Sequence, residues 1–279
     1  MAERIADRYR AWEQTCEQRF RKLRENEEAL NRLFLQIYGL ELPHEVAERE
    51  VSIRRADLQR EIRSLISYAV GCIFGRYSPD SRGLCYAGGT WDPAKYRTVI
   101  PVADNILPIC THPCFSPDLA ERAADFIQSV YGEETLEENL SFLAAALDGT
   151  GTTREVLRRY LTRGFFRDHC KVYRKRPIYW LFTSGVQSGF RALVYLHRWD
   201  SDTLETLRMR YAMPYLTHLA ELQAQCPADS RQRMQLKAEA DSVQQFAERL
   251  YALRDVPVCM QDGVAENYAK FSAVLAPIP

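Results

Sequence analysis

The chain has 279 residues, of which 46% are hydrophobic and 27% are charged, and these ordinary globular proportions exclude a disordered or fibrous protein. Its 37 basic residues balance 37 acidic ones, so a uniformly basic nucleic-acid coat is excluded, although a local basic patch is not. No apolar run approaches the roughly 18 residues of a membrane span, and the charged N-terminus is unlike a signal peptide. Eight scattered cysteines with no export signal therefore indicate reduced thiols and a cytoplasmic location.

The first part of the chain is predicted to hold two long helices. Apolar residues recur at helical spacing from Ile5 to Ile37, which predicts an amphipathic helix that Gly39 ends. A second helix is predicted over about 54–74, where a wide apolar face is typical of a core helix. Residues 78–115 are rich in Gly and Pro, and they predict irregular packed loops with at most short strands.

Three shorter helices are predicted next. Ser116 is the expected N-cap of the first, with Pro117 in its first turn. A short helix follows over 136–147, and Thr152 and Glu155 form a capping box for another.

The last part of the chain combines strands with long helices. Aromatic and β-branched runs at 178–183 and 190–196, joined by a loop containing two glycines, predict a β-hairpin. Residues 202–225 and 230–253 predict an antiparallel helical hairpin, kinked or interrupted near Pro214.

These elements predict a mainly α (α+β) fold. We expect a helical bundle-like domain with a small antiparallel β-hairpin and a C-terminal antiparallel helical hairpin. The predicted parts are a long N-terminal helical arm (1–40), a central helical domain (41–200) containing the β-hairpin (177–198), and the helical hairpin (201–279).

Charge is segregated along the chain. Residues 115–150 hold eight acids and one arginine, a net charge of −7, whereas residues 153–210 hold thirteen cations and five acids, a net charge of +8. Cations interleaved with aromatic residues are typical of a nucleic-acid surface. The alternative is that the acidic helix pairs with the basic one inside the domain, with the aromatic residues in the core.

We hypothesise that the basic segment contacts DNA. One of the adjacent strand residues Tyr179 and Trp180 is expected to be exposed, because side chains alternate along a strand. The alternative is that these residues fix the hairpin against the helices. The proposed contact residues are Arg174, Lys175, Arg176, Tyr179, Trp180, Arg191, His197 and Arg198.

No catalytic or cofactor-binding motif is found in the sequence. Gly149-Thr-Gly151 is a short pair of glycines in an acidic loop, unlike a dinucleotide fingerprint after a strand. Cys110, His112 and Cys114 are a weak metal-site candidate, because their one-residue spacers are unlike those of structural zinc sites. A loop of ordinary thiols is favoured, so we expect no catalytic residue, metal or cofactor on this chain.

Several segments nonetheless resemble one protein family. They include residues 26–40, 63–77, 131–140 and 262–270, and the most specific are Arg176-Pro-Ile-Tyr-Trp-Leu-Phe182 and Ala192-Leu-Val-Tyr-Leu-His-Arg198. In order and sequence they are similar to the C-terminal region of the PglX family. These proteins are adenine-specific DNA methyltransferases of BREX (bacteriophage exclusion) defence.

The resemblance covers only the C-terminal part of a longer protein. The family's S-adenosylmethionine loop and Asn-Pro-Pro-Tyr/Phe motif, which holds a flipped adenine, are not found here. The chain is therefore expected to be an excised or truncated region, inactive alone and located in the bacterial cytoplasm. One departure is Val186, where the family is expected to have a lysine at the hairpin tip.

The resemblance implies a division of labour. A methyltransferase domain N-terminal to this region would bind S-adenosylmethionine and methylate the base, while this region would help to clamp and read double-stranded DNA. The alternative is a helical scaffold module that docks the methyltransferase domain or other BREX proteins. Neither reading implies contact with a membrane.

Overall fold

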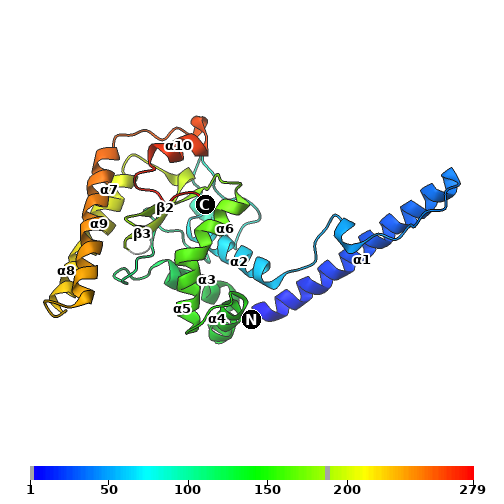
Figure 1. The fold of residues 1–279 in the computed structure, drawn as a ribbon, viewed down its shortest axis with the longest axis horizontal. Helices are drawn as coiled ribbons and strands as arrows, with labels where there is room; N and C mark the ends of the chain where they lie inside the picture. Colours follow the sequence, from blue (N-terminus) through cyan, green and yellow to red (C-terminus); the bar gives the residue numbers. More distant parts are fainter. Residues whose placement is uncertain (1–2, 186–188) are drawn as a thin grey trace.

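The chain forms a body and a projecting arm. A computed structural model describes residues 3–185 and 189–279; Val186, at the predicted hairpin tip, lies outside them. Helix α1 (Ile5–Tyr38) leaves the body, and residues 39–57 return along it (Figure 1). The predicted helix is confirmed, and Gly39 ends it with φ 63°, a left-handed conformation that glycine adopts without strain. A small separate cluster of Phe20, Val46 and Val51 fixes the returning segment.

Helix α2 (Leu58–Ile73) lies in the core of the body. It buries Ile62, Ile66 and Val70, as its apolar pattern predicts. It begins at residue 58 rather than 54 because the Asp57 carboxylate caps it, accepting the Arg60 backbone N–H at 2.7 Å.

Helices α3 (Leu119–Tyr131), α4 (Leu136–Ala146) and α5 (Thr153–Arg159) form one end of the body. The prediction that Ser116 caps α3 is wrong. Asp118 is the N-cap, since its carboxylate accepts the backbone N–H groups of Ala120 and Glu121. The predicted capping box at Thr152 is confirmed. A π-helical turn (Tyr160–Gly164) then joins α5 to α6 (Phe165–Val172).

A small antiparallel sheet supports these helices. The predicted hairpin is confirmed as β2 (Tyr179–Thr183) and β3 (Arg191–Tyr195), with Leu181 opposite Leu193. A third strand, β1 (Ile106–Pro108), pairs with β3, which gives the order β1-β3-β2. It comes from the Gly- and Pro-rich segment for which only short strands were predicted.

Both faces of the sheet are covered, and this overturns one prediction. Tyr179 and Trp180 point to opposite faces, yet they are only 1% and 0% exposed. Tyr179 stacks on Phe74 on one face, while Trp180 packs edge-on against Tyr268 on the other. The expectation that one of the two side chains is exposed is therefore wrong. It holds for a sheet with one face in solvent, whereas this sheet is covered on both faces.

The C-terminal part is an antiparallel helical hairpin, as predicted. It comprises α7 (Thr203–Leu207), a π-helical turn (Arg208–Ala212), α8 (Met213–Ala224) and α9 (Arg231–Leu253), followed by α10 (Val264–Lys270) (Figure 1). The π-helical turn ends at Ala212, two residues before Pro214, near which an interruption is predicted. One hydrophobic core runs from Ile5 to Ala276, and the three-part division of the chain stays a prediction.

Two further features concern membrane-spanning helices and disulfides. Within residues 3–185 and 189–279, no helix has the length and apolarity needed to cross a membrane. All eight cysteines are free thiols.

Candidate nucleic-acid interface

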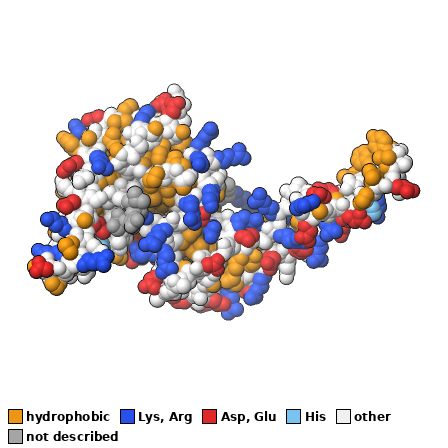
Figure 2. Space-filling model, viewed as in Figure 1, with side chains coloured by type: hydrophobic (Ala, Val, Ile, Leu, Met, Phe, Trp, Pro, Cys, Tyr) orange, Lys and Arg blue, Asp and Glu red, His pale blue; other side chains and the backbone are white. Residues whose placement is uncertain are grey.

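Six exposed cations lie in the π-helical turn before α6, on α6 and in the turn after it. Arg163, Arg167 and Lys171 recur every four residues and therefore share a helix face, while Phe165 and Phe166 are buried beneath them. Three more cations follow in the turn before β2. We call this set the basic ridge; its members are Arg163, Arg167, Lys171, Arg174, Lys175 and Arg176. Figure 2 shows Lys and Arg side chains gathered over this part of the body.

The turn after α6 holds its cations in an unusual backbone conformation. Arg174 and Lys175 have φ values of 51° and 62°, in the left-handed region that favours glycine. Backbone hydrogen bonds hold the turn, since the Lys175 N–H donates to the Cys170 carbonyl at 2.8 Å and the Arg176 N–H to the Tyr173 carbonyl at 2.9 Å. Strained backbone of this kind clusters at functional sites. The turn thus presents three consecutive cations to solvent.

The acidic and basic segments do pair, but not on the ridge. Arg154 lies 2.8 Å from Glu137, and Arg158 bonds to the buried Asp118, so internal pairing is the correct description for α5. On the ridge, the one ion pair between described residues is Arg167 with Asp168, at 3.9 Å. The ridge therefore carries an excess of positive charge.

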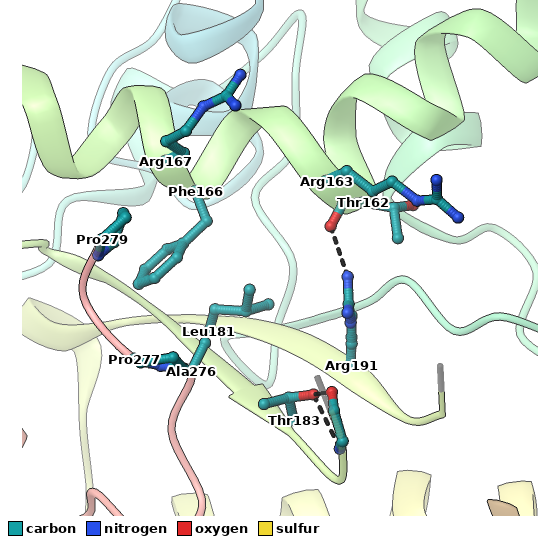
Figure 3. A pocket seen from close by; sticks show the side chains of 11 residues that line it. Thr162, Arg163, Phe166, Arg167, Leu181, Thr183, Arg191, Ala276, Pro277 and Pro279 are labelled. Atoms are coloured by element: carbon teal, nitrogen blue, oxygen red, sulfur yellow. Dashed lines mark hydrogen bonds between the residues drawn. The ribbon is translucent and has the colours of Figure 1, made fainter. Parts of the chain in front are cut away.

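A cavity of about 520 Å³ lies between α6 and the sheet. Arg163 and Arg167 stand at its helix side, and Phe166 points down toward Leu181 (Figure 3). Arg191 rises from β3 and donates from Nη1 to the Thr162 carbonyl at 2.8 Å. Burial, and then the charge of Arg163, lowers the pKa of Arg191, which is only 9% exposed. Arg191 thus joins the sheet to the helix beneath the ridge.

Arg198 and His197 lie elsewhere in the body. The Arg198 guanidinium donates to the carbonyls of Phe74, Val102 and Ala103 at 2.8–3.1 Å, and it stacks over Trp91. Burial lowers its pKa. His197 is half-buried against Tyr195, and burial, followed by the charge of Arg76, also lowers its pKa. Both residues were predicted to contact DNA, but their contacts here hold the fold together.

Of the eight predicted contact residues, the structure brings Arg174, Lys175 and Arg176 together at the surface. Tyr179, Trp180 and Arg191 are buried. Arg163, Arg167 and Lys171 were absent from the predicted contact set. Their four-residue spacing in the sequence could have predicted that they lie on one helix face, next to the start of the turn.

The metal candidate is not assembled. Among the residues that the structure describes, no three His, Cys, Asp or Glu side chains converge as metal ligands would. The Cys110 thiol is buried, which raises its pKa, and it donates to the Arg191 carbonyl at 3.8 Å. His112 instead has Glu239 3.7 Å from its Nε2.

The loop between Gly149 and Gly151 does not have the geometry of an S-adenosylmethionine loop. The Gly149–Gly151 loop joins α4 to α5 rather than following a strand, and a Cβ at Gly149 would clash with the Val156 side chain. The loop therefore offers no cradle for a cofactor.

Comparisons with known proteins place the chain beside two methyltransferases. It is 39% identical to the adenine-specific methyltransferase PglX of Lacticaseibacillus casei (strain Zhang), over 97% of this chain and 24% of that protein. It is also 39% identical to the adenine-specific methyltransferase BrxX of Escherichia coli O9:H4 (strain HS), over 78% of this chain and 20% of that protein. No family model matches the chain.

The resemblance found in the sequence is thereby confirmed, and the partial coverage is consistent with a C-terminal region. Over nearly its whole length, this chain is similar to part of the adenine-specific methyltransferases PglX and BrxX, and it spans about a quarter of the length of the first and a fifth of the second.

Proposed function

We propose that this chain is a non-catalytic, DNA-binding region of a BREX adenine-specific DNA methyltransferase. The assignment to a methyltransferase rests on the names of the two relatives. The assignment to BREX and to double-stranded DNA rests on the sequence resemblance. S-adenosylmethionine and the methyl-transfer chemistry would belong to the part of the relatives that this chain does not match. In this proposal the chain holds the duplex while the methyltransferase domain acts on the adenine.

The basic ridge is the observation that carries the proposal. With the described residues, its six exposed cations make one weak ion pair, Arg167 with Asp168, so they are available to neutralise phosphates. Three lie at consecutive positions on a hydrogen-bonded turn, which limits the entropy lost on binding. A cation with no acidic partner contributes more free energy to phosphate binding than a cation that is already paired, such as Arg154 or Arg158.

The salt dependence of binding tests this surface directly. Each phosphate that a cation neutralises adds about −0.9 to the slope of log affinity against log salt. Fluorescence anisotropy with a labelled duplex would measure the slope for the wild type and for the triple variant Arg174→Gln, Lys175→Gln, Arg176→Gln. We expect the variant to bind more weakly and its slope to be shallower by about 3.

A matched variant controls for net charge. Arg19, Lys22 and Arg32 are exposed cations on α1, and their replacement by Gln removes the same charge from the arm. This control is expected to keep the wild-type affinity and slope. Equal losses in both triple variants, or an unchanged slope in the ridge variant, would contradict the proposal.

A second candidate function, a docking module, rests on the end of the arm. Several large apolar side chains there are 51–70% exposed, well away from the body (Figure 2). We call them the arm tip: Leu33, Phe34, Ile37, Tyr38, Leu40 and Leu42. An apolar patch of this kind marks a surface for another protein, and the methyltransferase domain or another BREX protein is the expected partner.

Co-elution tests the docking module. The chain would be mixed with the separately produced methyltransferase part of the protein and followed by size-exclusion chromatography with light scattering. The double variant Phe34→Ser, Ile37→Ser should lose co-elution, whereas the triple arm variant that lacks Arg19, Lys22 and Arg32 should keep it. Docking that survives the double variant would exclude the arm tip as the contact.

A further inference from the structure

A second cavity, of about 520 Å³, lies between α2 and α6, and Tyr179 of β2 also lines it. Five tyrosines form much of its wall: Tyr68, Tyr77, Tyr160, Tyr173 and Tyr179. Tyr160 belongs to the π-helical turn, a feature frequent at functional sites. The volume falls in the range of small-molecule sites, which are largely aromatic with a few polar groups.

A buried histidine beside this cavity has an unused donor. Its Nε2 accepts the backbone N–H groups of Ile178 and Tyr179, both at 3.1 Å, so the proton of His169 must lie on Nδ1. That Nδ1 is buried and has no hydrogen-bond acceptor among the described residues. A buried donor without an acceptor is unfavourable, so an acceptor supplied by a ligand would stabilise it.

Arg63 has the same deficiency. Its Nε is also buried without an acceptor. Its Nη2 lies 3.5 Å from the Gln59 Oε1, and its Nη1 lies 3.6 Å from the Asp168 carboxylate, both long contacts for a guanidinium. Within the part of the chain that the structure describes, these two are the buried side-chain N or O atoms that lack a partner, and both residues line this one cavity.

The neighbouring charges leave Arg63 available. Arg60 is occupied by Glu61 and by the Arg55 carbonyl. Asp168 already accepts the Tyr160 hydroxyl at 3.2 Å. With Arg60 paired to Glu61, the other charged side chains of the cavity wall are Arg63 and Lys171, which face the carboxylates of Asp57 and Asp168. A ligand that brings an oxyanion would give the Arg63 guanidinium a closer acceptor than Gln59 or Asp168 provides.

We propose that this cavity binds a nucleoside monophosphate, with its flat ring against the tyrosines and its oxyanion on Arg63. Tyrosine faces suit a planar ring, and a half-exposed guanidinium with spare donors suits a phosphate. The site is separate from the exposed turn of the basic ridge, so it can exist whether or not the chain binds duplex DNA. A free nucleotide and a nucleotide at the end of a strand share this chemistry, and the experiment distinguishes them.

Isothermal titration calorimetry of the full chain tests the proposal. The probes are AMP, GMP, CMP and UMP, with adenosine and inorganic phosphate titrated alone. We expect at least one monophosphate to bind, and both partial probes to bind more weakly. Arg63→Gln should weaken the binding about ten-fold or more, since a charged hydrogen bond is lost. Arg32→Gln, the same change on the exposed face of the arm, should leave it unchanged.

A second readout keeps the test independent of folding. Circular dichroism would confirm that Arg63→Gln is folded, and the Nδ1–H resonance of His169 in ¹⁵N NMR should shift when the nucleotide is added to the wild type. The inference is overturned if no monophosphate binds or if Arg63→Gln and Arg32→Gln bind alike. Binding of a single-stranded oligonucleotide but of no free monophosphate would overturn it too, and would leave the duplex proposal standing.

Discussion

His169 lies against Tyr179 with their rings 4.6 Å apart and stacked, and its Nε2 accepts the backbone N–H of the same tyrosine. The histidine therefore fixes the start of β2 through one nitrogen while its ring is part of the core. Burial, and secondarily the charge of Arg76, lowers its pKa to about 3 from the ordinary 6.5. The imidazole stays neutral in the folded protein throughout the physiological pH range.

The first prediction is an acid instability caused by this histidine. Below about pH 6.5 the unfolded chain binds a proton at His169 that the folded chain binds only near pH 3. Stability is thus fully present above pH 6.5 and is lost as the pH falls, by about 1.4 kcal/mol per pH unit. Urea unfolding between pH 7 and pH 4 measures this slope. His169→Gln should flatten it, whereas His44→Gln on the returning segment of the arm should not.

Local patterns in the sequence predicted the helices and the hairpin well. The spacing from Ile5 to Ile37 and the stop at Gly39 gave α1 its correct length, because helix periodicity and glycine caps are local properties. Strand β1 was different. Its three residues pair only with β3, far along the chain, and include Pro108, so no local pattern could predict them.

The candidate site was only partly predictable. Arg174 and Arg198 look alike in the sequence, since each lies in a basic stretch beside aromatic residues. The structure separates them, because Arg198 is surrounded by three carbonyls from distant loops and Arg174 is not. Which cations face solvent depends on such long-range packing, and composition alone cannot report it.

The second prediction concerns Tyr215 of α8, whose hydroxyl links the loop after β1 to α9. Its hydroxyl donates to the Glu239 carboxylate at 2.5 Å and accepts the His112 backbone N–H at 3.2 Å. Tyr215→Phe leaves a buried carboxylate oxygen without its donor, so we expect a loss of about 1–3 kcal/mol in the free energy of unfolding. Tyr251→Phe, at a residue that is 51% exposed, is the control and should change the urea midpoint little. Equal midpoints for Tyr215→Phe and the wild type would show that the hydroxyl contributes nothing.

The third prediction separates structural from DNA-binding arginines. Arg198→Gln removes a guanidinium that satisfies three carbonyls, and we expect a loss of about 2–3 kcal/mol of stability. Arg198→Lys keeps the charge but cannot match the planar fork, so it should be destabilised similarly. Both variants should keep the wild-type salt slope in DNA binding under conditions where they remain folded. A shallower slope in Arg198→Lys would mean that this arginine also serves the interface.

The fourth prediction is that glycine substitutions in the strained turn of the basic ridge weaken DNA binding without lowering the stability of the protein. Arg174 and Lys175 adopt φ values of 51° and 62°, which cost a side-chain-bearing residue about 1 kcal/mol and glycine almost nothing. Arg174→Gly and Lys175→Gly should therefore leave the unfolding free energy unchanged or raise it by up to about 1 kcal/mol, even though glycine gains entropy in the unfolded chain. The same variants should weaken duplex binding and make its salt slope shallower by about 1 each, because each removes one phosphate contact. Thermal unfolding and anisotropy on the same samples measure both quantities. If Arg174 and Lys175 serve only the packing of the turn, the glycine variants would instead be less stable and would bind DNA with unchanged affinity.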